Sequence, residues 1–215
     1  MNDISARLDL VGITWDPAEY VIHTFGGLAV YARPGVPLPE KHALQCKGTG
    51  VIVFAGAIVP PGKISLNGQS NLVYIGEHCK LKASVINITA DNGLVKVGAR
   101  TKATNASNIK LANSGTITVG EDCYLARHAI ISNSDGHAIY KRSTGDRRNP
   151  DRDVSIGNHV MIQENARIGK GAVIGDGALI GELSVVSGVV PAHCYYAGVP
   201  ARLVEDDIAW EALLD

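Results

Sequence analysis

Residues 154–190 read VSIGNHVMIQENARIGKGAVIGDGALIGELSVVSGVV, and hydrophobic residues recur along this segment at a fixed interval. A large aliphatic residue returns at every sixth position, and a small or β-branched residue follows it four positions later. The aliphatic positions are Ile156, Ile162, Ile168, Ile174, Ile180 and Val186, and the later positions are Val160, Ala166, Ala172, Ala178, Ser184 and Val190. Neither a helix nor a strand has a period of six. The pattern predicts a coil of short strands whose aliphatic side chains fill the interior.

The same period continues more loosely towards the N-terminus. Aliphatic or small residues recur at six-residue intervals in three earlier groups: Ile75 and Leu81; Val97, Ala103 and Ile109; and Val119, Leu125 and Ile131. We therefore expect the coil to begin by about residue 72. The polar segment 132–153 interrupts the period, which predicts a loop that leaves the coil. Long excursions from a compact scaffold are commonly functional.

The sequence thus predicts an all-β solenoid with an appendage at each end. We assign residues 1–50 to an N-terminal extension or cap, 51–200 to the solenoid domain and 201–215 to a C-terminal tail. The hydrophobic segment 51–59 is expected to be a strand or a first irregular coil. In the tail, EDDIAWEALLD has acidic residues followed by apolar ones at helical spacing, which predicts a short helix.

Composition limits the classes of function. A chain of 215 residues fits one large domain, and its net charge of -1 provides no global attraction to nucleic acid or to an anionic membrane. The first ten residues lack a basic segment followed by an apolar one, and no run of about 18 apolar residues occurs, so we expect a soluble, cytoplasmic protein without membrane insertion. The four cysteines form no CxxC pair, so we expect reduced thiols and no metal site.

Several motifs carry a family resemblance. Hexapeptide runs that end in AGVPARLV, residues 197–204, resemble the left-handed β-helix acyltransferases, which include galactoside, maltose and serine acetyltransferases. The segments NLVYIGEHCKL (71–81), SNSDGHAIY (132–140) and GDRRNPDRDVSIGNHV (145–160) look most like capsular polysaccharide O-acetyltransferases. The resemblance spans residues 72–210. It implies a left-handed parallel β-helix that forms a homotrimer, with acetyl-CoA along the subunit interface and a sugar or polysaccharide hydroxyl as the acceptor.

The implied reaction needs a base for the acceptor hydroxyl, a donor for the oxyanion and a site that holds both substrates. Histidine suits the role of base, and His137 is the one of seven histidines that matches the family's catalytic histidine. Asn133 and Asp135 match residues that orient the imidazole or the acceptor, and a turn role is the alternative for either. The backbone N–H of Glu164 matches the oxyanion donor.

The resemblance also assigns the contacts with coenzyme A. The backbone of Glu182 matches a pantetheine contact, Ser187 matches a further contact, and Arg202 matches a basic residue that can meet a phosphate. Met161 replaces a tryptophan that in relatives lies near the thioester and the acceptor, and Gln163 replaces a corner glycine. Gly188 stands where a phosphate-binding lysine is common in relatives. These changes weaken the transfer of the family's contacts to this chain.

We therefore expect an acetyl-CoA-dependent O-acetyltransferase that acts on a sugar or polysaccharide and uses no metal. The departures at Met161, Gln163 and Gly188 leave open a catalytically silent trimeric scaffold or glycan-binding protein. An amino-sugar N-acetyltransferase also stays open, because the same base and donor serve an amine acceptor. A metal enzyme of the γ-carbonic anhydrase kind shares the prism, but the closely spaced histidine pair that it needs is missing. The basic residues of the loop either suit an anionic glycan or are solvated beside neighbouring acids.

Overall fold

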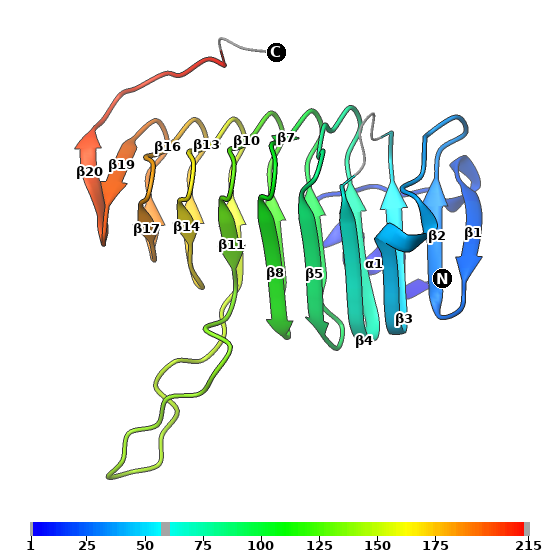
Figure 1. The fold of residues 1–215 in the computed structure, drawn as a ribbon, viewed down its shortest axis with the longest axis horizontal. Coiled ribbons are helices and arrows are strands. Elements are labelled where there is room, and N and C mark those ends of the chain that lie inside the picture. The colour runs from blue at the N-terminus through cyan, green and yellow to red at the C-terminus, as the bar shows by residue number, and fades with distance from the viewer. Residues whose placement is uncertain (1, 57–60, 213–215) are drawn as a thin grey trace.

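The computed structural model describes residues 2–56 and 61–212, and it confirms the predicted solenoid of parallel strands, with about seven turns. Figure 1 shows the coils side by side, from the N-terminal end on the right to the C-terminal end on the left. Each regular coil contributes three short strands, so the solenoid has three faces. A fourteen-stranded sheet supplies two faces and a six-stranded sheet supplies the third.

The three faces are named by the order in which the chain visits them. The first face contains β5 (Val85–Ala90), β8 (Asn108–Asn113), β11 (Ile130–Ser132), β14 (Arg167–Ile168) and β17 (Val185–Val186). The second contains β6 (Leu94–Val97), β9 (Thr116–Val119), β12 (Val154–Ile156), β15 (Val173–Ile174) and β18 (Val189–Val190). The third contains β7 (Lys102–Ala103), β10 (Tyr124–Leu125), β13 (Met161–Ile162), β16 (Leu179–Ile180) and β19 (Tyr195–Gly198).

Parallel pairing stacks equivalent side chains in the interior. Ile156 of β12 pairs with Ile174 of β15, which pairs with Val190 of β18. Each of these residues is only 2% exposed. Ile156 and Ile174 are eighteen residues apart, so one coil here consists of three hexapeptides. The six-residue period in the sequence therefore marks the positions that point into the core.

The corners between faces require small residues. A Cβ atom added to Gly120 would collide with the carbonyl oxygen of Gly157 in the next coil. Cys79 and Cys123 occupy small inward positions next to corners and are fully buried. Their thiols lie 3.1 Å from the carbonyl oxygens of Gly98 and Gly157, respectively. Close stacking of successive coils thus explains the high glycine content and the scarcity of large aromatic residues.

The coil begins earlier in the chain than the repeat predicts. β2 (Leu28–Ala32), β3 (Leu44–Phe54) and β4 (Lys63–Ile75) pair in parallel and form its first layers. The predicted domain boundary at residue 50 therefore falls inside β3. In the predicted segment 51–59, residues 51–54 belong to β3, whereas residues 57–59 lie outside the described part of the chain.

The N-terminal segment covers the outer surface of the second face at this end. The segment begins with α1 (Asn2–Asp9) and η1 (Pro17–Glu19). β1 (Val21–Phe25) follows and pairs antiparallel with β2, and the short helix η2 (Lys41–Ala43) lies between β2 and β3. Leu8 and Trp15 form a buried cluster with the outward side chains of Tyr31, Leu72 and Leu94. This outer cluster gives the first coils a second apolar layer outside the prism.

The C-terminal tail runs back along the solenoid (Figure 1). After β20 (Ala201–Glu205), which pairs antiparallel with β19, the Ile208 N–H donates to the carbonyl oxygen of His193 at 2.9 Å. The indole of Trp210 stacks on the imidazole of His159, with ring centroids 4.2 Å apart. The predicted short helix is not present in residues 201–212. Contacts with the coil replace helical hydrogen bonds there, since so short a helix is marginal on its own; residues 213–215 lie outside the described part.

No helix within the described residues is long and apolar enough to cross a bilayer. Among the same residues, no group of three or more histidine, cysteine, aspartate or glutamate side chains is arranged to hold a metal ion. All four cysteines are free thiols.

Candidate active site

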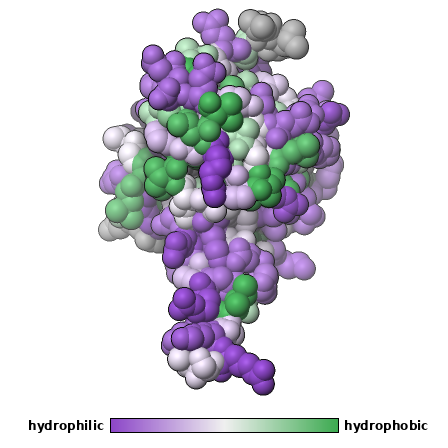
Figure 2. Space-filling model, turned by 90° about the vertical axis from the view of Figure 1, so that its left-hand side faces the viewer, coloured by the Kyte–Doolittle hydropathy of each residue, from purple (hydrophilic) through white to green (hydrophobic). Residues whose placement is uncertain are grey.

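The segment between β11 and β12, residues 133–153, leaves the solenoid as a long arm. It corresponds to the segment 132–153 that the sequence predicts as a loop. The two limbs of the arm lie antiparallel, with a bridge between Tyr140 and Arg147. Figure 2, viewed from the C-terminal end, shows the arm below the body with a mostly hydrophilic surface.

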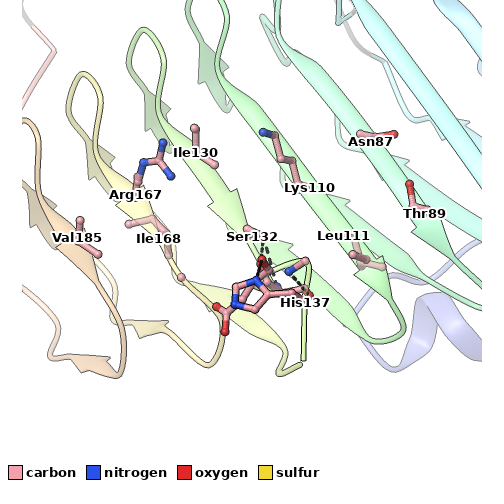
Figure 3. Close-up of a pocket in the computed structure, with 15 residues that line it drawn as sticks. Asn87, Thr89, Lys110, Leu111, Ile130, Ser132, His137, Arg167, Ile168 and Val185 are labelled. Carbon is pink, nitrogen blue, oxygen red and sulfur yellow. Dashed lines mark hydrogen bonds between the residues drawn. The ribbon is translucent and has the colours of Figure 1, made fainter. Parts of the chain in front are cut away.

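An open groove of about 620 Å³ lies on the first face beside the base of the arm. Outward residues of the first-face strands form its floor, and residues 134–137 form one wall. Lys110 of β8 and Arg167 of β14 bring exposed cationic groups to this floor, with Ile130 of β11 between their strands (Figure 3). The groove therefore combines apolar surface with positive charge.

His137 lines this groove at the base of the arm (Figure 3). Its Nδ1 lies 3.1 Å from the carbonyl oxygen of Asp135. Because a carbonyl oxygen can only accept, this contact requires the hydrogen on Nδ1 and, in the neutral ring, leaves the lone pair on Nε2. Nε2 has no hydrogen-bond partner among the described residues. In this tautomer Nε2 carries the lone pair that a general base would need.

The Asp135 carboxylate forms hydrogen bonds with Lys170 and Asn149 and not with the imidazole of His137. Its Oδ2 accepts hydrogen bonds from Lys170 Nζ at 2.5 Å and from Asn149 Nδ2 at 2.8 Å. These bonds, that of Lys170 first, hold the pKa of the Asp135 carboxyl below its ordinary value. Asp135 therefore contacts His137 through its backbone carbonyl, and its carboxylate secures the base of the arm.

Asn133 is fully buried at the point where the chain leaves the first face. Its Oδ1 accepts from the Ala112 N–H at 2.8 Å, and its Nδ2 donates to the carbonyl oxygens of Ala112 at 3.1 Å and Ser114 at 2.7 Å. The side chain thus satisfies backbone groups of the neighbouring coil with which β11 does not pair. In the structure Asn133 anchors the first residue of the arm.

The residues predicted to bind the donor lie elsewhere on the solenoid. Glu164 lies at the corner between the third and first faces, and its backbone N–H has no hydrogen-bond partner within the described residues. Its carboxylate pairs with Arg127 at 2.9 Å. At the same corner of the next coil, the Glu182 N–H donates to Gln163 Oε1 at 3.0 Å. Met161 points outward from β13 and is half-buried.

One chain does not bring the predicted site residues to a single place. His137 follows β11 and Glu164 precedes β14, and these parallel strands are neighbours, so the two residues lie at opposite edges of the first face. Ser187 lies between β17 and β18, at the edge where His137 lies. Arg202 is exposed on β20 at the C-terminal end of the solenoid. His137, Asp135 and Asn133 are together at the arm, whereas Glu164 and Glu182 share the other edge.

The groove and the arm also contain residues that the sequence motifs do not indicate. Lys110 and Arg167 are next to the inward Ile109 and Ile168, so the repeat itself marks them as outward positions on one face. Asn149 gives no comparable signal, because its partners lie ten to fourteen positions earlier, across the arm.

Comparisons with known proteins agree with this architecture. The family described as bacterial transferase hexapeptide (six repeats) matches residues 153–188. A polysialic acid O-acetyltransferase of Neisseria meningitidis is 35% identical over 127 residues, which cover 49% of this chain and 59% of the relative. One from Escherichia coli O1:K1 / APEC is 34% identical over 138 residues, covering 64% of this chain and 44% of the relative. The crystal structure of the polysialic acid O-acetyltransferase OatWY matches with a TM-score of 0.63 and 26% identity, over 80% of this chain and 92% of that chain.

Residues 153–188 thus carry hexapeptide repeats of the bacterial transferase type, which agrees with the resemblance in the motifs. Over a longer stretch the chain is similar to the polysialic acid O-acetyltransferases. The chain spans about half the length of the curated relatives that it matches.

Proposed function

We propose that this protein is an acetyl-CoA-dependent O-acetyltransferase that modifies a hydroxyl group of an acidic glycan. The observation that carries the proposal is the placement of His137. Its ring lines an open groove, its Nδ1 is engaged by a carbonyl oxygen, and its Nε2 is left without a partner in the described chain. Similarity to polysaccharide O-acetyltransferases supports the choice of hydroxyl acceptor.

The proposed reaction begins when Nε2 of His137 takes the proton of the acceptor hydroxyl. The acceptor oxygen then attacks the carbonyl carbon of the acetyl thioester and forms a tetrahedral oxyanion. The backbone N–H of Glu164 is the proposed donor to that oxyanion. When the intermediate collapses, the carbon–sulfur bond breaks, and the CoA sulfur takes the proton from His137. The products are the acetyl ester and CoA, and the imidazole is neutral again.

This scheme requires two copies of the chain at each site, because His137 and Glu164 lie at opposite edges of the first face. We propose a homotrimer in which the His137 edge of one chain meets the Glu164 and Glu182 edge of the next. The donor contacts at Glu182, Ser187 and Arg202 belong to the same proposal. Sedimentation equilibrium of the purified protein should give the mass of three chains, and a monomer that transfers acetyl groups would contradict the shared site.

The charge of the groove supports an acidic acceptor. Lys110 and Arg167 line the groove, and Asp135, the acidic residue on its wall, is paired with Lys170. Replacing both groove cations, as in Lys110→Gln with Arg167→Gln, should raise the KM for an acidic glycan about tenfold, since each cation attracts the acceptor. The KM for acetyl-CoA should stay the same. An equal loss of affinity for a neutral glycan of similar length would argue against charge recognition.

The function is tested by incubating the protein with acetyl-CoA and either polysialic acid or a neutral oligosaccharide. We expect release of CoA that depends on the acidic glycan, and a product whose acetyl group is removed by mild base, as an ester is. A base-resistant amide product would instead indicate an N-acetyltransferase. Absence of acetyl-CoA binding in a calorimetric titration would support the silent scaffold. The physical cause would be the hydrogen bond from the Glu182 N–H to Gln163 Oε1, since the N–H would then not be free for pantetheine.

A further inference from the structure

Asn149 joins the two limbs of the arm directly behind His137. Asn149 as a whole residue is 8% exposed, although the residues on either side of it in the arm are exposed. Its Oδ1 accepts from the Ile139 N–H at 2.6 Å. Its Nδ2 donates to the His137 carbonyl oxygen at 2.9 Å and to Asp135 Oδ2 at 2.8 Å. One amide group thus fixes the chain before, at and after the histidine.

Lys170 ties this amide to the rigid part of the molecule. It belongs to the next coil, directly after β14, and its side chain is 20% exposed. Its Nζ donates to Asp135 Oδ2 at 2.5 Å and to the Asn149 carbonyl oxygen at 3.1 Å. Both limbs of the arm are therefore fastened to one ammonium group. Charge-assisted bonds of this kind are stronger than bonds between neutral groups.

The orientation of the imidazole depends on this fastening. The carbonyl that holds His137 Nδ1 belongs to Asp135, and Gly136 lies between the two residues with φ at +78°. A glycine in this region has wide conformational freedom, and no neighbouring atom lies within 4 Å of the position that a Cβ would take there. Without anchors on both sides, the Asp135 carbonyl and the His137 ring would move independently.

We infer that Asn149 is a positioning residue for His137, and that Lys170 supports it from the next coil. The inference rests on the proposed function of His137 as the general base. The amide acts through the backbone at Asp135 and His137, and it holds the ring in the form with hydrogen on Nδ1.

The main test compares Asn149→Ala with Asn71→Ala. Asn71 is a matched control because it is also buried but lies on β4, away from the groove. As in Asn149, its Oδ1 accepts a hydrogen bond from a backbone N–H, at 2.9 Å, and its Nδ2 donates to a backbone carbonyl oxygen, at 2.7 Å. Asn149→Ala should lower kcat about 10- to 100-fold and leave the KM for acetyl-CoA within about twofold. Asn71→Ala should lower thermal stability without this loss of kcat. Equal kcat for Asn149→Ala and wild type would overturn the inference.

The support from Lys170 is tested by rescue. Lys170→Met removes both donated bonds and should reduce kcat by a similar factor. Lys170→Arg keeps a cationic donor within reach and should recover most of the activity. Equal activity of Lys170→Met and Lys170→Arg would show that the ammonium group does not act on the histidine.

A spectroscopic readout separates this inference from the proposed function. The ¹⁵N shifts of the His137 ring in the neutral form should report hydrogen on Nδ1 in the wild type and a mixture of both tautomers in Asn149→Ala. If wild type transfers no acetyl group but this shift occurs, the proposed function fails and the positioning role stands. If transfer occurs but the tautomer is the same in both proteins, positioning by Asn149 is refuted.

Discussion

At the scale of single residues, burial determines which cysteines can react. Burial raises the pKa of the Cys79 thiol to about 12 and that of the Cys123 thiol to about 11. Cys194 is also buried, whereas Cys46 on β3 is partly exposed, although burial raises the pKa of its thiol as well. Since the thiolate is the reactive form, these shifts protect the core cysteines.

In the native protein at about pH 8, we expect dithionitrobenzoate to label no cysteine other than Cys46. All four thiols should react after denaturation. The measurement is the absorbance of the released thionitrobenzoate over time. Rapid native labelling of two or more thiols would show that the coil opens at its corners.

The ion pair between Asp135 and Lys170 has a predictable dependence on pH. The hydrogen bond from Lys170, followed by that from Asn149, lowers the pKa of Asp135 in the folded state. The carboxyl therefore stabilises the arm above its unfolded pKa of about 3.9, and this contribution is lost as the pH falls through the lower folded-state value.

Lys170→Met should raise the pKa of Asp135 towards its ordinary value, because the largest cause of the shift is removed. The carboxyl ¹³C shift of Asp135, followed from neutral to acidic pH, measures this directly. A variant whose Asp135 titrates where the wild type does would show that Lys170 has little effect on the carboxylate.

The residues of the candidate site differ in how far the sequence could predict them. His137 could be selected because it stands in a motif, and its role is a proposal that the geometry supports. The bonds of Asn133 and Asp135 could not be predicted, because they depend on how the arm folds back onto the coil. Asn149 was missed for the same reason, since nothing in the sequence pairs it with residues across the arm.

At the scale of elements, the hexapeptide period predicts the coils from residue 72 onward and misses the earlier ones. β3 and β4 are long strands that each run across two faces, so their inward residues alternate by two and not by six. Gly48 and Gly68, both with positive φ, allow the two strands to bend at the corner. Local spacing predicts a C-terminal helix, and contacts of the tail with the coil override that preference.

The tail contributes to stability through one aromatic contact. Trp210 stacks on His159 and also donates its Nε1–H to the His159 carbonyl oxygen at 2.9 Å. Trp210→Ala should lower Tm by roughly 2–5 °C, because both contacts are lost. Trp210→Phe keeps an aromatic ring and should lower Tm by about half as much as Trp210→Ala does. Thermal unfolding followed by circular dichroism measures both, and an unchanged Tm for Trp210→Ala would mean that the tail is not held in solution.

At the scale of the whole molecule, the three faces have different surroundings. The N-terminal segment covers the second face at one end, and the tail lies along the corner beside His193 and His159. The first face carries the groove and the arm. The residues matched to base and oxyanion donor lie at its two edges. The proposed trimer would bring the two edges of neighbouring chains together, and the rigid parallel coil fixes the distance between the edges of each chain.

The role of His137 as the base is tested by comparing acetyl transfer by His137→Ala with that by His42→Ala. His42 is an exposed histidine near the N-terminal end, far along the chain from the groove, and serves as the control. With acetyl-CoA and an acidic glycan, we predict that His137→Ala loses activity at least about 100-fold while binding acetyl-CoA as the wild type does, and that His42→Ala keeps full activity. A folded His137→Ala protein that transfers acetyl groups at the wild-type rate would show that His137 is not the base.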